Sequence, residues 1–432
     1  MKKIYQYILL VVAMVATASC SNELDDTLQP VNNGNLQFVV SDFPMFGEGT
    51  LTRAIGTQDE GKTAWENGDQ IIVTLISQKY GEQAAALTYD GSSWSTEASL
   101  SYLENETPSV SVFYAPCYEV TEEGTMQLRS GMQLGMTEYL SGNYEIENGI
   151  MTITFEGAIR TYSRLRIAGL ANQTLTVTTT NFTPAGATEV ATAAYTLTTD
   201  DNGNAFLYGV FAEDATISVK QGDITLKDYT FTVEKNPNGT EYNKSYALDA
   251  RPVIDGTLGG KTEATEDDIT ALVEQLKEYV DNGITTIIVP GSEPAMIDVG
   301  SLTITAIGEA IYRLSKEESY NGKIDLVLPD VTEIVDQEFY GARALNSINL
   351  PKVTTVGDGA FYDCQYLEEL TFGSVVTAIN HKLRAEFYKV GEKVEGCDLV
   401  LNREQVNAEA DYQPNIETRT WWNTEWKSIT LK

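Results

Sequence analysis

Apolar and polar residues alternate through much of the first 250 positions of the chain. A period of two puts successive side chains on opposite faces of a β-strand. Turn-forming pairs such as Asp90-Gly91 and Asn148-Gly149 separate the alternating segments, with no helical period between them. The pattern therefore predicts antiparallel strands. The clearest are LQFVV at 36–40, TLTVTTT at 174–180, TISVK at 216–220 and DYTFTVE at 228–234.

The strand-rich part of the chain is too long for one small sandwich. We predict a mainly β protein with two tandem antiparallel β-sandwiches, at 36–156 and 157–250. Residues 251–262, RPVIDGTLGGKT, are rich in glycine and indicate a linker. A third domain then occupies residues 263–432.

The third domain opens with the one segment of clear helical period. Thr265 precedes EDDITALVEQLKEYVDN and can cap it, and Gly283 follows it. Three acidic residues at 266–268 lie in the first turn, where the helix dipole favours negative charge. We expect the apolar stripe of this helix to face a core and the helix to cap the segments that follow. The stripe consists of Ile269, Leu272, Val273, Leu276 and Val280.

The strings LVLPDVTEIVDQEF at 326–339 and INLPKVTTVGDGAF at 348–361 are near copies, displaced by 22 positions. A third copy begins at Phe372 and runs one residue late, and a degenerate earlier one shows in ITTIIVPG and ITAIGEAI. A fixed period with apolar residues at fixed offsets predicts a solenoid, whose coils stack because none buries its own apolar side. We expect CDLVLNREQ and the terminal WWNTEWKSITLK to close the far end. The terminal tryptophans, favoured as part of this closure over a sugar-stacking platform, are Trp421, Trp422 and Trp426.

The N-terminus, MKKIYQYILLVVAMVATASC, has a short basic region followed by an apolar run that is too short to span a membrane. Small residues lead directly into Cys20, an arrangement that resembles a bacterial lipobox. We predict a signal peptide at 1–19, lipidation at Cys20 and a flexible acidic tether at 20–35. This implies an outer-membrane lipoprotein facing the cell exterior; the alternative is an ordinary signal peptide.

The chain contains 29 basic and 62 acidic residues, a formal net charge of -33. This balance argues against nucleic acid as a partner, because phosphate binding needs clustered lysine and arginine. Besides Cys20, the chain has Cys117, Cys364 and Cys397, with no CxxC pair. One bridge between Cys364 and Cys397 is possible, but three buried thiols are favoured.

Candidate chemistry is sparse. His381 is the single histidine, which leaves no multi-histidine metal site and no motif for a catalytic triad. The segment DGTLGGKT ends like a phosphate-binding loop, but Asp255 stands where that motif needs glycine. DDNGN at 200–204 lacks the closing glutamate of a calcium loop and is better explained as a hairpin turn. We predict no enzymatic activity, no cofactor and no metal.

The repeat pattern, LPxVTxI followed by AF, YxxC and leucine, resembles the BspA-type leucine-rich repeats of bacterial surface proteins. GDGAFYDCQYLEELTF at 357–372 carries the resemblance best. It implies a short leucine-rich-repeat solenoid and places Cys364 inside the coil.

Five segments in the first half resemble, in order, the fimbrillin family from which type V pili are built. In that family a protease cuts after an arginine and frees the first strand, which implies Arg53 and Ala54 as a possible maturation site here. The chain lacks the family's usual histidine in the last segment. The segments are TRAIG at 52–56, TAWENGDQIIV at 63–73, VFYAPC at 112–117, TEYLSG at 137–142 and FEGAIRTYSRLRI at 155–167.

Together these features favour a surface lipoprotein for adhesion or fimbria-related assembly. Its expected partners are a host or bacterial surface protein or a matrix component, bound through the repeat domain, and other fimbrial subunits. The alternative is a glycan-binding lipoprotein of a polysaccharide-uptake system, which stacks sugars on tyrosine and tryptophan.

Overall fold

The computed structural model describes residues 37–44, 61–103, 106–147, 149–155, 160–232, 239–380 and 387–432. The chain divides into two compact units. Unit 1 combines the N-terminal residues to Pro44 with Ala64–Gly131 and Tyr139–Ile159, and unit 2 holds Met45–Thr63, Met132–Glu138 and Arg160–Lys432.

Unit 1 contains a seven-stranded sheet in the order β1-β9-β8-β5-β2-β3-β4. Neighbouring strands are antiparallel, except that β1 runs parallel to β9. The strands are β1 (Gln37–Val40), β2 (Gln70–Ser77), β3 (Gly81–Tyr89), β4 (Trp94–Ser95), β5 (Ser109–Tyr114), β8 (Leu140–Glu147) and β9 (Ile150–Thr154), with a separate hairpin of β6 (Tyr118–Val120) and β7 (Met126–Leu128).

An aromatic cluster connects the two ends of this sheet. Trp65, just before β2, packs edge-on against Phe43 at 4.8 Å and Trp94 at 5.0 Å between ring centroids. Its indole N–H donates to the Ser41 carbonyl at 2.8 Å. Such edge-to-face pairs stabilise beyond the area they bury. Trp65 therefore anchors the entry to β2 beside the residues that follow β1.

Unit 2 begins with a six-stranded sheet in the order β12-β11-β13-β10-β15, with β14 paired to β13. All pairs are antiparallel except β10 with β15. The predicted alternation is confirmed, because Leu175, Val177 and Ile217 point into the core. The strands are β10 (Ser163–Ala168), β11 (Thr174–Pro184), β12 (Ala191–Thr198), β13 (Asn204–Gln221), β14 (Ile224–Thr230) and β15 (Ser245–Asp249).

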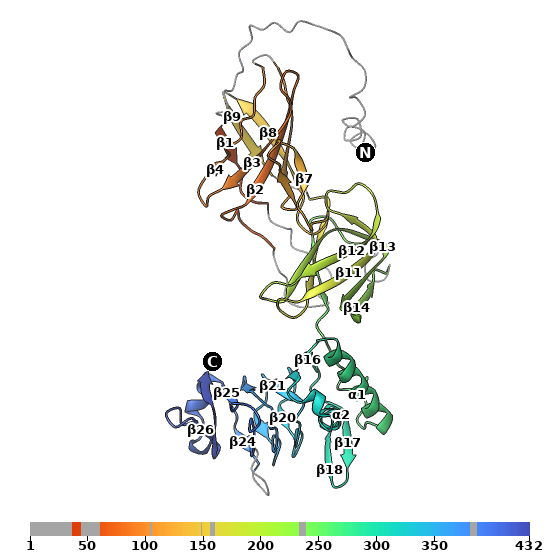
Figure 1. Cartoon of the computed structure of the whole chain (residues 1–432), viewed down its shortest axis with the longest axis vertical. Coiled ribbons are helices and arrows are strands. Elements are labelled where there is room, and N and C mark those ends of the chain that lie inside the picture. The colour runs from red at the N-terminus through yellow and green to blue at the C-terminus, as the bar shows by residue number, and fades with distance from the viewer. Residues whose placement is uncertain are drawn as a thin grey trace. The chain divides into compact units, whose positions relative to one another are not determined.

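The repeats form two parallel sheets, drawn in turquoise to blue in Figure 1. Between the two clear copies the pairing follows the sequence period, since Leu326 pairs with Ile348 and Ile348 with Leu370. The first sheet holds β16 (Thr286–Ile288), β19 (Ile324–Val327), β21 (Leu345–Leu350), β23 (Glu369–Phe372), β25 (Asp398–Leu401) and β28 (Ser428–Leu431); the second holds β20 (Glu333–Ile334), β22 (Thr355–Val356) and β24 (Ala378–Ile379).

Extra strands lengthen the array at both ends. The predicted third copy is confirmed and runs one residue late, since Ile379 lies 23 positions after its partner Val356. Beyond it β25 and β28, predicted only to close the array, continue the first sheet. At the near end Ile254 is fully buried and its N–H bonds to the Ile288 carbonyl. Part of the glycine-rich segment 251–262 thus belongs to this core.

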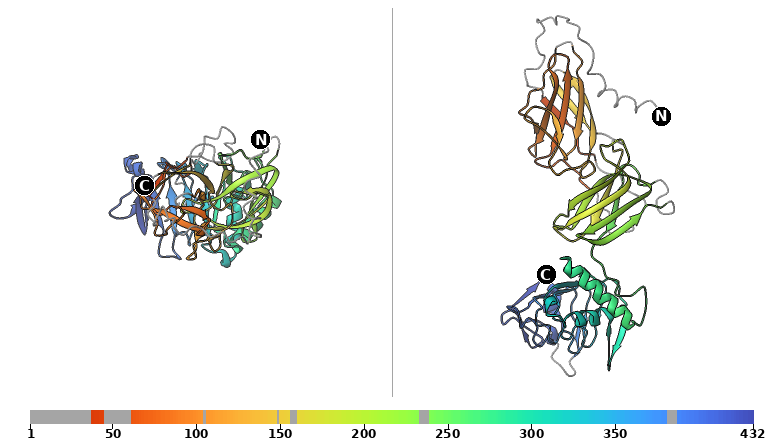
Figure 2. Two further views of the ribbon diagram at one scale, coloured as in Figure 1. Left: turned by 90° about the horizontal axis from the view of Figure 1, so that it is seen from above. Right: turned by 45° about the vertical axis from the view of Figure 1, so that its right-hand side comes forward.

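The predicted helix is confirmed as α1 (Glu266–Asp281), with Thr265 and Asp268 forming a reciprocal capping box. Its buried face is Ile269, Leu272, Leu276 and Tyr279, so the sequence stripe omitted Tyr279. Figure 2 shows α1 as the long green helix.

The prediction of one helix is wrong, because the described residues include a second, α2 (Ala306–Leu314). Its residues ITAIGEAI were predicted to be a degenerate repeat. Thr305 instead caps a nine-residue helix that is buried on nearly all sides. It follows a hairpin of β17 (Met296–Val299) and β18 (Leu302–Thr305). The remaining short elements are η1 (Glu318–Tyr320), η2 (Arg403–Asn407), η3 (Ala410–Tyr412), β26 (Thr420–Trp421) and β27 (Thr424–Glu425).

Candidate binding surface of the repeat domain

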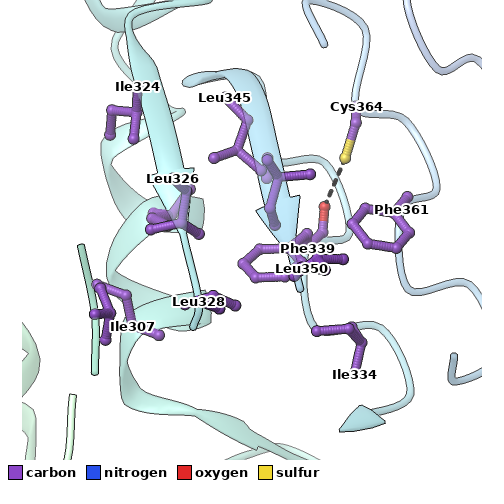
Figure 3. Close-up of a cluster of buried hydrophobic side chains, with 14 of the residues drawn as sticks. Ile307, Ile324, Leu326, Leu328, Ile334, Phe339, Leu345, Leu350, Phe361 and Cys364 are labelled. Atoms are coloured by element: carbon purple, nitrogen blue, oxygen red, sulfur yellow. Dashed lines mark hydrogen bonds between the residues drawn. The ribbon is translucent and has the colours of Figure 1, made fainter. Parts of the chain in front are cut away.

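A ladder of buried phenylalanines fixes the coils against one another. Phe339 and Phe361 stack with centroids 5.7 Å apart and planes 22° apart, and Phe361 and Phe387 at 5.8 Å and 8°. Aliphatic residues from each coil fill the space around the first two rings (Figure 3). Because interiors pack at crystal-like density, this ladder holds the outward side chains of adjacent coils in fixed register.

The cysteines are inward structural residues. Cys364 lies beside the ladder, and its thiol donates to the Phe339 carbonyl at 3.0 Å (Figure 3). Burial raises the pKa of the Cys364 and Cys397 thiols, so neither is a ready thiolate. Cys117 is buried as well, and none of these three described cysteines forms a disulfide. The prediction of three buried thiols is confirmed.

The first parallel sheet presents two rows of side chains outward, between the inward leucines and isoleucines. Hydrogen-bonded neighbours in a parallel sheet lie about 4.8 Å apart, so each row is closely spaced. The first row, in strand order, is Thr286, Asp325, Ser347, Glu369, Asp398 and Ser428. The second is Ile288, Val327, Asn349, Thr371, Val400 and Thr430, of which Ile288 and Val400 are buried. We call these two rows the sheet face.

Hydrogen bonds between neighbouring strands position the carboxylates of the sheet face. Asp325 accepts from the Asn346 amide at 2.8 Å and the Ser347 hydroxyl at 2.7 Å. Asp398 accepts from the Ser428 hydroxyl at 2.7 Å. Glu369 is exposed and accepts a hydrogen bond from the hydroxyl of Thr371, on the same strand, at 3.1 Å. The arrangement offers a fixed row of acceptors to a partner's cations and amides, without a nucleophile–base pair.

A second outward feature is a row of tyrosines, each next to a ladder phenylalanine. Tyr340 and Tyr362 stack with centroids 5.2 Å apart, and Tyr362 and Tyr388 at 5.0 Å. Tyr388 is 47% exposed and Lys389 lies over its ring. The sequence prediction missed this row, although the pair Phe-Tyr occurs three times in the repeat domain. Its third occurrence comes 26 rather than 22 positions after the second, which breaks the period.

One buried carboxylate connects the first coil to α2. Glu338 accepts hydrogen bonds from the Thr305 N–H at 3.1 Å and from the Thr305 hydroxyl. Burial raises the pKa of Glu338 to about 7, against the opposing effect of these two bonds. A side chain at Gly308 would come within 2.7 Å of Glu338, which explains the glycine in the first turn of α2. The sequence pattern gave no sign of this contact.

Tryptophans close the far end, as predicted. Trp421 and Trp426 are nearly fully buried and pack against Phe387, with Trp421 also contacting Phe372. Trp422 stacks on Tyr412 at 5.2 Å. Trp421 and Trp426 are therefore part of the closure, whereas Trp422 is half-buried.

The two rejected ligand motifs have structural explanations. In the segment that resembles a phosphate loop, Asp255 accepts from the N–H groups of Thr257 and Gly259. Asp255 also accepts from the Thr257 hydroxyl. This bond, together with the two backbone bonds, lowers the pKa of the Asp255 carboxyl. The backbone N–H groups that a phosphate would need therefore already donate to the Asp255 carboxylate. In the other segment, Asp200 closes the β12–β13 hairpin by accepting from the N–H of Asn202 and Asn204.

Several predicted sites lie outside the described residues: Cys20, Arg53, Ala54 and His381. Among the residues that are described, no group of three or more His, Cys, Asp or Glu is placed to hold a metal ion. Within the same residues, none of the helices combines the length and apolar character needed to cross a bilayer.

Residues 322–390 match a family model described as "BspA type Leucine rich repeat region (6 copies)". The predicted resemblance of the repeats is confirmed for this region. A search of curated proteins gave no match. The chain is also similar to a crystal structure from Bacteroides fragilis NCTC 9343, provisionally described as a cell adhesion protein. The identity is 10% and the TM-score 0.25, over 50% of this chain and 92% of the other. That likeness is too low to carry an argument about fold or function.

Proposed function

We propose that this chain is a non-enzymatic surface lipoprotein for adhesion or fimbria-related assembly, which binds a protein partner through its repeat domain. In this proposal two fimbrillin-like sandwiches form a stalk, Cys20 supplies the lipid anchor and the outer membrane displays the chain outward. The observation that carries it is the sheet face, a fixed array of exposed and half-buried acceptors on packed coils. Rigid, pre-positioned polar groups reduce the entropy lost when a partner binds.

The test compares two charge reversals in the full chain displayed on cells. Glu369→Lys changes the centre of the sheet face, and Glu395→Lys changes an exposed carboxylate in a turn outside both sheets. We expect Glu369→Lys to reduce adhesion to protein-coated surfaces at least about tenfold, the effect of losing one central charged contact. Glu395→Lys is expected to leave adhesion unchanged. Equal adhesion by both variants would contradict a role of the sheet face in adhesion.

A polymerising version of the proposal involves Arg53 and Ala54. Among the described strands β1 is an edge strand whose single partner is β9, and it runs parallel to β9, so its removal would expose one side of β9. A strand from another subunit can then restore those main-chain bonds. Sequencing the N-terminus of native protein distinguishes the versions. A start at Ala54 with a heat-sensitive ladder on gels supports polymerisation, and a lipid-blocked Cys20 with monomer mobility supports a standalone lipoprotein.

The tyrosine row favours a second candidate function, glycan binding for polysaccharide uptake. Tyr388 is exposed and Tyr340 and Tyr362 are half-buried, so the row provides some aromatic surface with polar tips, which suits sugars. Calorimetric titration against a panel of oligosaccharides tests it, with Tyr388→Ala as the variant expected to lose binding. If no glycan in the panel binds the wild-type chain, this candidate is rejected and the adhesion proposal is unaffected.

A further inference from the structure

Strand β12 forms one end of the antiparallel sheet in unit 2, with β11 as its single neighbour. The Thr199 N–H bonds to the Gln173 carbonyl of the β11 side. In an antiparallel ladder the direction of the backbone groups alternates, so residues 193, 195 and 197 also bond toward β11. The N–H and C=O groups of the intervening residues point away from the sheet. These residues are Thr192, Ala194, Thr196 and Thr198.

The outer edge of β12 is open. Across the described chain, no hydrogen bond joins the backbone N–H or C=O groups of these four residues to another segment. Their side chains are exposed, whereas Tyr195 and Leu197 on the opposite face are buried. Four N–H and four C=O groups along this eight-residue strand thus face solvent, where another strand could pair with them.

Other sheet edges in the described residues carry the features that usually prevent strand addition. Edge strands β1, β4 and β16 have four, two and three residues. Strand β14 carries Lys227 and Asp228, β15 (the opposite edge of the same sheet) has five residues and carries Asp249, and β28 is flanked by Lys427 and Lys432. The part of β3 that β4 leaves uncovered carries Glu82. Proteins commonly protect edges with short strands and with charge. Strand β12 is longer and has no charged residue or proline.

The lack of charge extends over the whole β11–β12 hairpin. From residue 167 to residue 199, Glu189 is the single charged side chain, although 21% of the chain is charged. In a protein of net charge -33, most surfaces repel a second copy. This hairpin is where two copies can approach with little short-range repulsion. A basic or acidic peptide would find no complementary charge there, so a second copy is the occupant that the composition favours.

We propose that β12 pairs antiparallel with β12 of a second copy of this chain, which makes one continuous sheet across a two-fold axis. With Tyr195 opposite its own equivalent, Ala194 faces Thr196 and Thr192 faces Thr198, so every outward N–H and C=O finds a partner. This register also keeps the buried faces of both strands on the same side. The pairing goes beyond the proposed ligand of the repeat domain and is independent of it.

The experiment is sedimentation velocity of the full chain purified from cells, with three variants. Thr196→Lys places like charges near each other across the interface, and Ala194→Pro removes an outward N–H without touching the bonds to β11. Thr178→Lys is the matched control, because Thr178 is exposed on β11, one strand inside the edge. We expect the wild-type chain to dimerise, Thr196→Lys and Ala194→Pro to raise the dissociation constant at least about tenfold, and Thr178→Lys to change it less than about twofold.

Salt provides a further readout. Long-range repulsion between anionic copies is screened at higher ionic strength, so added salt should tighten a dimer joined through neutral strands. Thermal unfolding of Ala194→Pro checks that the variant remains folded, and Thr196→Lys tests the edge independently. A monomeric wild-type chain at about 100 µM would overturn the proposal, because such weak pairing has no biological weight. A dimer that survives Ala194→Pro and Thr196→Lys, or that Thr178→Lys weakens equally, would also overturn it.

Discussion

The antiparallel sheet β10–β15 and the repeat array both bury clusters of phenylalanine, but they build them from different neighbours. In the antiparallel sheet Phe211 packs against Phe182 at 4.4 Å and Phe231 at 4.8 Å, and no fixed sequence offset relates the three. In the repeat array Phe361 packs against Phe339 and Phe387, which occupy the same place in the coils on either side.

This difference predicts how far the destabilisation caused by a core substitution should extend. A coil of a solenoid contacts mainly the coils before and after it, so its stability is a sum of local terms. In the antiparallel sheet, β13 alone pairs with β10, β11 and β14. Loss of a core residue there should weaken several strands together.

Phe361→Ala should give the largest effect. The side chain is fully buried between two stacked rings, and truncating such a phenylalanine costs about 3–5 kcal/mol of unfolding free energy. The loss should remain local. Hydrogen exchange followed by mass spectrometry should show faster opening of residues 322–390, with residues 163–250 unchanged. Phe211→Ala is the matched variant in the other region, and it should accelerate exchange across β10, β11 and β13 together. If both variants accelerated hydrogen exchange over equally wide regions, the expected difference between the repeat array and the antiparallel sheet would be contradicted.

Glu338 should make the repeat array, but not the antiparallel sheet, sensitive to pH. Its pKa of about 7 in the folded chain lies above the value of 4.5 for an unburied glutamate. The folded state therefore holds the proton more tightly, so this contribution to stability is complete below about pH 4.5 and is lost as the pH rises through about 7. The loss is on the order of 3 kcal/mol.

Denaturant unfolding between pH 4.5 and 8 measures this effect. Glu338→Gln keeps the shape and hydrogen-bond acceptor without the titration, and it should flatten the pH dependence of repeat-array stability. His381→Gln removes the single histidine of the chain, so it serves as the control and should leave the slope in place. If Glu338→Gln retains the wild-type slope, the buried carboxylate is not its source.

The sequence predicted the repeat array more closely than the antiparallel sheets, for a physical reason. A period of 22 fixes both the strand and its partner, so the pairing of Leu326 with Ile348 could be stated in advance. In the antiparallel sheet the alternation identified β11 as a strand, but the sequence does not say that β13 lies beside it. Contacts between unlike segments were also missed. The Glu338 contact with Thr305 joins a coil to a helix, and no repeat relates the two.

Thr265→Ala should give a moderate and confined effect. The Thr265 side chain accepts from the Asp268 N–H at 3.3 Å, and the Thr265 N–H donates to the Asp268 carboxylate at 2.9 Å. Removing a threonine cap typically costs about 1 kcal/mol of helix stability. Exchange in the first turn of α1 should increase, with little change at β21 or β23. Thr262→Ala, an exposed position that caps no helix, is the control.

The smallest effect is expected at the ion pair between Lys352 and Asp330, which joins equivalent places in successive coils at 2.8 Å. The lysine side chain is 58% exposed, and such pairs contribute about 0–1 kcal/mol, because water solvates both ions well without the contact. Asp330 also accepts from the Gly291 N–H at 3.1 Å, and the lysine followed by this amide lowers the pKa of the Asp330 carboxyl. Asp330→Ala should therefore destabilise more than Lys352→Ala, since it leaves the Gly291 N–H without its acceptor.

A double-mutant cycle measured at low and high salt separates the two contributions: the Lys352 coupling should fade with salt, and the additional cost of Asp330→Ala should persist. A salt-resistant coupling comparable to the Phe361 effect would mean that the surface of the coils, and not their stacked interior, holds the array together.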